Sequence, residues 1–315
     1  MNVYPWQKEV FERLLASRLP HALILKGRRG TGKLDFAHRL AQALLCESPL
    51  EDGSACFSCT ACSWFDHGIH PDFRKIEPET NDEGKKAAQI AVDQIRALSA
   101  FMGMTTHRNG YRIVLIHPAD AMNAHSANAL LKTLEEPQGK TLFILVTHKP
   151  QQLLPTILSR CRVIAMPFPN PRAAQGWLDE KGIGDSISLL AESGHAPLSA
   201  LELVSIDRAG PFLKEVDSSS DPVSIAEAFQ KADLPMVVSW LQKWCHDLAS
   251  QAFSGKIRYF PDFSDRIVEI SGRMDRIELM RFHRKLCHAQ RISAHPVNAR
   301  LFLEELILTY RSMRR

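Results

Sequence analysis

The stretch "LILKGRRGTGKLDFA", residues 23–37, contains the pattern G-x-x-x-x-G-K between Gly27 and Lys33. The apolar run "HALILK" (21–26) before the pattern predicts a buried strand, and "LDFAHRLAQALLC" (34–46) after it has helical spacing. A strand, a glycine-rich turn and a helix are the context of a phosphate-binding loop, because backbone N–H groups and the helix N-terminus then face phosphate oxygens. We therefore expect a phosphate-loop fold rather than a chance turn of glycine and arginine.

Two departures from the usual pattern predict that this loop holds no Mg²⁺. Leu34 stands where a Ser or Thr hydroxyl normally ligates the ion. After the apolar run 111–116, His117 and Pro118 occupy the positions of two expected acids, and Asp120 comes too late to replace them. Whether the loop still holds nucleotide or free phosphate stays open. The loop residues expected to face a phosphate are Gly27, Gly30, Thr31, Gly32 and Lys33.

Composition is that of an ordinary globular protein, with 45% hydrophobic and 23% charged residues. A length of 315 residues allows two or three domains. The formal net charge of +4 permits contact with nucleic acid through a local patch but does not argue for it. No apolar run is long enough to span a membrane, and "MNVYPWQKEVFERLL" has no signal pattern, so we expect a cytoplasmic protein.

Apolar strand patterns alternate with helical patterns through the first half of the chain, which predicts a mostly parallel sheet with helices on both faces. The proline-rich "MPFPNP" (166–171) reads as a linker, and the sequence after it is almost entirely helical in pattern. The strand candidates are "HALILK" (21–26), "DFRKIEP" (72–78), "YRIVLIH" (111–117) and "TLFILV" (141–146). Pro150 and Pro155 then bracket a short helix that leads to "SRCRVIAM" (159–166).

Four cysteines gather at Cys46, Cys56, Cys59 and Cys62. Four thiolates can close a tetrahedral Zn²⁺ site with no open position, so we expect a structural zinc module at 46–62. Iron–sulfur ligation and four unligated thiols are the alternatives. We do not expect His67 and His70 to be ligands, because four cysteines already complete the coordination of the metal. The other three cysteines, Cys161, Cys245 and Cys287, are expected to be single buried thiols.

The stretches "GRRGTGKL", "NALLKTLEEPQGKTLFILVTHKPQQLLPTILSRC" and "NARLFLEELIL" resemble bacterial clamp-loader AAA+ subunits of the DNA polymerase III type over essentially the whole chain. The resemblance implies an AAA+ domain at 1–166, a small helical lid at 167–206 and an all-α collar that oligomerises at 207–315. It also implies a zinc module in the first domain, which supports the four-cysteine interpretation.

The implied function is loading of a ring-shaped sliding clamp onto primed DNA, with gamma/tau motor subunits and a delta subunit as partners. Motor subunits of this family keep the full Mg²⁺ machinery. The losses at Leu34, His117 and Pro118 therefore fit a non-hydrolysing stator that serves a neighbour's ATP site. Two alternatives are an active AAA+ motor subunit and, from a different class, a P-loop nucleotide kinase.

The resemblance also assigns roles to two polar residues. Arg160, in "SRC", corresponds to an arginine that reaches the γ-phosphate in a neighbouring subunit. The alternative is a solvated loop arginine or a local ion-pair partner. Thr147, after "TLFILV", matches the family's nucleotide sensor, and the alternative is a strand-end hydroxyl that bonds the backbone.

Overall fold

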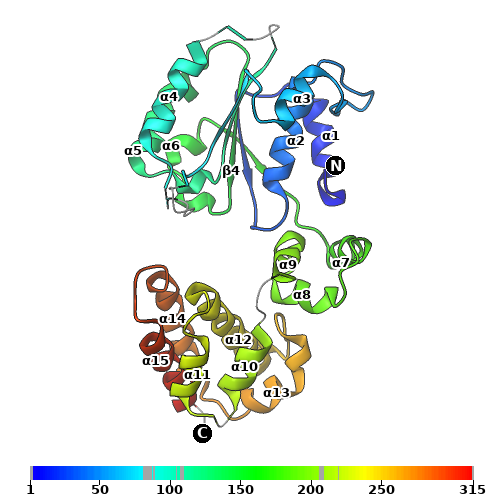
Figure 1. Ribbon diagram of the computed structural model, residues 1–315. Coiled ribbons are helices and arrows are strands. Elements are labelled where there is room, and N and C mark those ends of the chain that lie inside the picture. The colour runs from blue at the N-terminus through cyan, green and yellow to red at the C-terminus, as the bar shows by residue number, and fades with distance from the viewer. Residues whose placement is uncertain are drawn as a thin grey trace. The chain divides into compact units, whose positions relative to one another are not determined.

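The computed structural model describes residues 3–313 except 81–86, 88, 104, 107–109, 206–208 and 219. The chain forms two compact units, Met1–Ala173 and Ala174–Arg315 (Figure 1). Among the described residues, no helix is both long enough and apolar enough to cross a membrane.

The first unit contains a five-stranded sheet in the order β2-β3-β4-β1-β5, with every neighbouring pair parallel. Because β1 pairs with β4, and β4 with β3, the carboxyl ends of these three strands meet at one edge of the sheet. The strands are β1 (Ala22–Lys26), β2 (Phe73–Ile76), β3 (Arg112–Ile116), β4 (Thr141–Thr147) and β5 (Arg162–Ala165). The helices are η1 (Pro5–Gln7), α1 (Lys8–Leu15), α2 (Lys33–Leu45), α3 (Thr60–Asp66), α4 (Val92–Gly103), η3 (Ala119–Ala121), α5 (Ala124–Glu135), η4 (Pro150–Gln152) and α6 (Pro155–Leu158).

Side chains of the central strands enter two separate cores, one on each face of the sheet. Ile24, Val114 and Phe143 belong to the cluster that includes residues of α4 and α5. Leu23 and Ile144, each next to one of these residues in the chain, belong to the cluster with α1 and α2. Successive strand residues point to opposite faces, so strands buried on both faces are apolar throughout. Figure 1 shows these helices flanking the sheet on its two sides.

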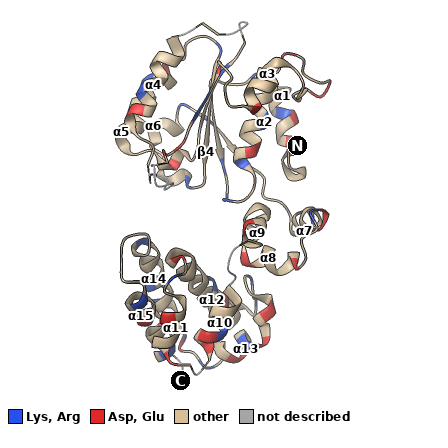
Figure 2. Cartoon of the chain, viewed as in Figure 1, with Lys and Arg blue, Asp and Glu red and all other residues tan. Residues whose placement is uncertain are grey.

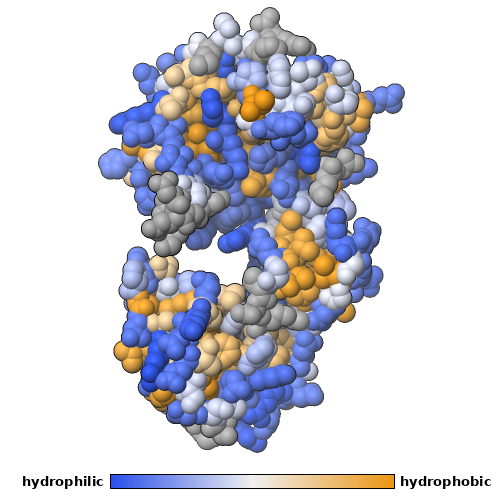
Figure 3. Space-filling model, viewed as in Figure 1, coloured by the Kyte–Doolittle hydropathy of each residue, from blue (hydrophilic) through white to orange (hydrophobic). Residues whose placement is uncertain are grey.

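Every described element from α7 onward is helical. A small cluster around Leu178 and Leu189 holds α7, α8 and α9 together, although Ile187 and Val204 remain exposed and apolar side chains gather on the surface there (Figure 3). A larger core surrounds the fully buried Trp240. The helices are α7 (Pro171–Glu180), α8 (Ser186–Glu192), α9 (Pro197–Leu203), α10 (Ala209–Asp217), α11 (Pro222–Phe229), α12 (Leu234–Ser254), η5 (Pro261–Phe263), α13 (Ser264–Ser271), α14 (Arg276–Ile292) and α15 (Ala299–Ser312).

The expected fold class is confirmed: a parallel sheet with helices on both faces precedes an all-helical region. The domain boundaries at 166/167 and 206/207 stay predictions, and the second lies outside the described residues. The expectation of a buried Cys287 is wrong, since this thiol is exposed whereas Cys161 and Cys245 are buried. Cys287 directly follows the buried Leu286, and adjacent residues on a helix point in different directions.

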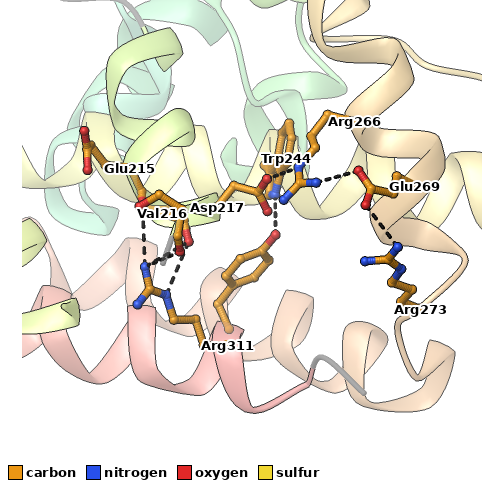
Figure 4. A network of polar contacts seen from close by, with 10 residues as sticks. Glu215, Val216, Asp217, Trp244, Arg266, Glu269, Arg273 and Arg311 are labelled. Atoms are coloured by element: carbon orange, nitrogen blue, oxygen red, sulfur yellow. Dashed lines mark hydrogen bonds and ion pairs between the residues drawn. The ribbon is translucent and has the colours of Figure 1, made fainter. Parts of the chain in front are cut away.

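Arg311 on α15 closes the C-terminal end of α10 (Figure 4). Its guanidinium donates hydrogen bonds to the carbonyl oxygens of Glu215, Val216, Ser218 and Ser220. The last four carbonyl groups of a helix have no partner inside the helix, and an arginine offers five N–H donors in a fixed fork. One side chain therefore ties the end of α10 to the last helix of the chain.

Two more contacts in Figure 4 join other helices of this region. The indole Nε1 of Trp244 on α12 donates to the hydroxyl of Tyr310 on α15 at 2.8 Å, and both side chains are buried. Arg266 on α13 forms ion pairs with Asp217 and Glu269. The buried polar groups of Trp244 and Tyr310 thus satisfy each other, as burial of polar groups favours.

We predict that Arg311→Met lowers the free energy of unfolding of the second unit by about 2–3 kcal/mol, because buried or half-buried carbonyl groups lose their donors. Chemical denaturation of the full chain, followed by circular dichroism and tryptophan fluorescence, measures the change. Arg284 is the control, since it is an exposed arginine on α14, a helix with several Lys and Arg residues (Figure 2), and it forms no ion pair with the described residues. Arg284→Met should change stability by less than about 0.5 kcal/mol. Equal losses in the two variants would contradict the capping role.

Candidate functional site

The turn between β1 and α2 has the backbone of a phosphate loop. Gly30 and Gly32 have φ of +75° and +81°, a left-handed conformation that glycine adopts at least cost. The helix α2 begins at Lys33, directly after Gly32, so its N-terminal N–H groups lie at the loop. A β-carbon at Gly32 would lie 2.3 Å from the ring of Tyr4. Packing and backbone conformation both require glycine there.

Lys33 is buried, and its ammonium group is bound by its own loop. Nζ donates to the carbonyl oxygen of Arg28 at 2.5 Å, and the hydroxyl of Thr31 donates to the same oxygen at 3.0 Å. Burial lowers the pKa of Lys33 to about 8, and the negative charge of Asp120 opposes only part of this shift. The cation expected to face phosphate therefore already has an acceptor within the loop.

The N-terminal segment of the chain is hydrogen-bonded to the phosphate loop. Trp6 Nε1 and Gln7 Nε2 both donate to the carbonyl oxygen of Thr31, at 3.0 Å and 2.8 Å. The hydroxyl of Tyr4 donates to Asp35 Oδ2 at 2.8 Å, and burial raises the pKa of Tyr4, which keeps that donor protonated. These are site contacts that the sequence analysis missed, because no motif relates the first turn of the chain to the phosphate loop.

Asp120 is a second site residue that the sequence analysis set aside. Its Oδ1 accepts hydrogen bonds from the hydroxyl of Thr147 at 2.6 Å and from the backbone N–H of His148 at 2.9 Å. Burial acts to raise the pKa of Asp120, but these hydrogen bonds outweigh it and hold the pKa below its ordinary value. Thr147 Oγ1 also accepts from the backbone N–H of Lys149 at 3.1 Å. Its hydroxyl therefore has local partners here, as the strand-end alternative expects.

Leu34 and His117 stand where oxygen ligands to Mg²⁺ are expected, and His148 lies next to His117. Leu34 packs partly buried against the core of α1 and α2. The rings of His117 and His148 meet edge to face, with centroids 5.5 Å apart. Burial lowers the pKa of both histidines to about 4, so both rings are neutral at pH 7. Mg²⁺ prefers oxygen ligands in octahedral geometry, and none of these three side chains supplies one.

Arg160 lies between α6 and β5 and is held locally. Its Nη2 forms an ion pair with Glu135 Oε1 at 2.6 Å. Nη1 donates to the carbonyl oxygen of Thr156 at 3.0 Å and to Ser159 Oγ at 3.3 Å. The side chain is still 35% exposed. The local ion pair that the sequence left open is formed, and part of the guanidinium remains accessible.

The four clustered cysteines converge as their spacing predicts. The Sγ atoms of Cys46, Cys56, Cys59 and Cys62 lie within 4.8 Å of one another, and Cys46 Sγ is 3.5 Å and 3.9 Å from those of Cys56 and Cys59. Sulfurs around a tetrahedral Zn²⁺, at Zn–S distances of about 2.3 Å, are about 3.8 Å apart. Backbone N–H groups also donate to Sγ of Cys46, Cys56 and Cys59 at 3.3–3.4 Å, which favours the thiolate. This cluster can hold a metal ion.

We predict that the first unit loses stability as pH falls from 6.5 toward 4. His117 and His148 have folded pKa values of about 4, below the ordinary value of 6.5. Between these values the unfolded chain binds more protons than the folded one, so the free energy of unfolding decreases with falling pH. The double variant His117→Asn, His148→Asn should show a shallower dependence in denaturation at a series of pH values. An unchanged slope, matching that of a variant at the exposed His295, would contradict this assignment.

Comparison with known proteins matches both parts of the chain to families of DNA polymerase III subunits. The family described as "DNA polymerase III, delta subunit" matches residues 6–170, and the family described as "DNA polymerase III, delta subunit, C terminal" matches residues 212–312. A solved structure, a DNA polymerase III gamma subunit-related protein of Thermotoga maritima, aligns with 98% of this chain and 100% of its own, at a TM-score of 0.46 and 19% identity.

Two curated relatives carry the same name. DNA polymerase III subunit delta′ of Pseudomonas aeruginosa is 38% identical over 77% of this chain and 76% of its own length. The subunit delta′ of Escherichia coli is 29% identical over 98% of this chain and 95% of its own. With a family match over half of the chain and this level of identity, the chain belongs to the DNA polymerase III delta′ subunit family.

Proposed function

We propose that this chain is a non-hydrolysing stator of the bacterial clamp loader and supplies Arg160 to the ATP site of a neighbouring subunit. Its partners are motor subunits of the gamma/tau type and a delta subunit, and the cytoplasmic assembly loads the sliding clamp onto primed DNA. The observation that carries the proposal is the closed phosphate loop, in which Lys33 Nζ is bound to the carbonyl oxygen of Arg28.

Three features together argue against ATP hydrolysis by this loop. Opening it for phosphate separates the buried Lys33 from its carbonyl acceptor. Leu34 and His117 offer no oxygen to a metal ion. Asp120, the nearby carboxylate, is engaged by Thr147 and the N–H of His148. Phosphoryl transfer depends on metal ions and a positioned water, so the loop lacks the required parts.

The sheet topology favours action of Arg160 on a neighbour. The chain's own phosphate loop follows the carboxyl end of β1, whereas Arg160 precedes the amino end of β5. Since β1 and β5 are parallel neighbours, these two ends lie at opposite edges of the sheet. Arg160 thus lies at the edge of the sheet opposite its own loop, and its charged fork suits the γ-phosphate of another subunit. Thr147, at the loop's own edge, is proposed only as a remnant of a nucleotide sensor.

We propose further that the cysteine cluster holds one structural Zn²⁺. Cys46 directly follows the last residue of α2, and Cys59 caps the N-terminus of α3 by accepting from Cys62 N–H. The intervening loop is polar and mostly exposed, with few apolar side chains to hold it. Both histidines nearby are engaged elsewhere: His67 contacts the carbonyl oxygen of Ser63, and His70 accepts from the N–H of Asp72. Four thiolates therefore form the complete ligand set.

We predict that the isolated chain shows no Mg²⁺-dependent ATP turnover above background with primed DNA present. In a reconstituted loader, Arg160→Ala should slow hydrolysis at one neighbouring site by about 10³-fold or more, because the transferring phosphoryl group loses a cation. Rapid-mix phosphate release separates that one site from the remaining ones, whose rates should not change.

Arg162→Ala is the matched control, since Arg162 is an exposed arginine two residues further along on β5. It should leave all sites at wild-type rates. Wild-type rates in Arg160→Ala would exclude the trans arginine. Turnover by the isolated chain that disappears in Lys33→Ala would instead identify an active motor subunit.

A separate prediction concerns the metal content of the purified chain. Purified chain should contain about one zinc ion, and Cys59→Ser should lose it together with stability of the first unit, because metal-binding energy contributes to folding. Elemental analysis and thermal unfolding provide the two readouts. Cys287→Ser, at the exposed thiol outside the cluster, should retain full zinc content. Iron in the protein, with absorbance in the visible range, would contradict the zinc assignment.

A further inference from the structure

The helix α5 ends in a carboxylate where physical chemistry disfavours one. Glu135 is the last residue of α5, and Glu136 follows it. The C-terminus of a helix carries a partial negative charge, which makes an acidic side chain unfavourable there by a few tenths of a kcal/mol to about 1 kcal/mol. Glu135 is partnered by Arg160 through the 2.6 Å contact. The pair joins the end of α5 to the turn after α6.

The guanidinium of Arg160 is held from two elements at once. Glu135 engages Nη2, while the carbonyl oxygen of Thr156 and the hydroxyl of Ser159 engage Nη1. Within the described part of the chain, the Nε–H of Arg160 has no hydrogen-bond partner. These contacts restrict the rotamers of a side chain with several rotatable bonds, and they leave N–H donors available to an outside anion.

We infer that Glu135 is a positioning residue for Arg160, an inference that rests on the trans role proposed above. An unrestrained arginine on the surface samples many rotamers and loses that freedom when it binds phosphate. The ion pair with Glu135 removes most of this freedom before the neighbour's nucleotide arrives. The carboxylate stays in contact with the guanidinium while the remaining N–H groups face the γ-phosphate.

Glu135 and Arg160 are both on the amino edge of the sheet. The helix α5 runs toward the start of β4, and Arg160 precedes the start of β5. The pair therefore belongs to the edge opposite the chain's own phosphate loop, where a neighbour's ATP site would have to lie. Both side chains are partly exposed, at 48% for Glu135 and 35% for Arg160, so the pair itself adds little to stability. A variant at Glu135 should consequently fold normally.

The test uses the complete reconstituted loader with Mg²⁺-ATP, sliding clamp and primed DNA. Glu135→Gln should lower the rate constant of hydrolysis at the neighbouring site by roughly 10- to 100-fold, as expected when a group that orients a catalytic side chain is lost. The ATP concentration for half-maximal rate should stay unchanged, because Arg160 acts mainly on the transition state. Glu136→Gln removes the adjacent exposed carboxylate and serves as the control, with wild-type rates.

Coupling to Arg160 is measured with the double variant. Glu135→Gln combined with Arg160→Ala should be no slower than Arg160→Ala alone, because Glu135 acts only through the arginine. Additive losses would show that Glu135 has a separate role. Thermal unfolding of each variant confirms that the comparison is made on folded chains.

The possible outcomes separate this inference from the proposed function. If Arg160→Ala slows the site and Glu135→Gln does not, Glu135 is no positioning residue and the trans role stands. If Glu135→Gln is faster than wild type, the ion pair restrains the arginine instead of orienting it, and the inference is overturned. If Arg160→Ala itself has no effect, the trans role fails and the inference fails with it.

Discussion

The buried ammonium group of Lys33 restricts which side chains can surround it at the carboxyl edge of the sheet, where the phosphate loop lies. Lys33 is 2% exposed, and a charge removed from water needs close acceptors or it loses its proton. The carbonyl oxygen of Arg28 and the nearby charge of Asp120 meet that need in part. Neutral His117 and His148 fit the same constraint, since protonated rings beside Lys33 would add like charges in a desolvated site. The surrounding residues thus offset part of the cost of burying this cation.

The two edges of the sheet consequently differ in what they can bind. At the carboxyl edge, the donors of Lys33 and Thr31 are engaged by the loop itself. At the amino edge, Arg160 is anchored by Glu135 but partly exposed, with donors remaining. Under the stator proposal, the closed loop belongs to the chain's own nucleotide site and Arg160 is the cation offered to a neighbour's site. This contrast gives the stator proposal its physical content.

Sequence patterns predicted the features that depend on local spacing. Alternating strand and helix patterns gave the parallel sheet, and two-residue gaps between Cys56, Cys59 and Cys62 brought their thiols together. The pairs that complete the site lie far apart in sequence. Tyr4 meets Asp35, and Glu135 meets Arg160, through tertiary packing of segments distant in sequence rather than through any periodic signal. Spacing alone could not show that Arg160 has a local partner, which is why both interpretations stayed open.

Packing within the loop accounts for the glycine and lysine of the G-x-x-x-x-G-K pattern without reference to nucleotide. Gly32 has φ of +81°, and any β-carbon there would clash with the ring of Tyr4 at 2.3 Å. A larger residue would strain the backbone and displace the N-terminal segment that donates two hydrogen bonds to Thr31. Lys33 likewise fills a structural role as the donor that closes the loop. A complete G-x-x-x-x-G-K pattern is therefore insufficient evidence for hydrolysis, and the residues around it, here Leu34 and His117, decide the chemistry.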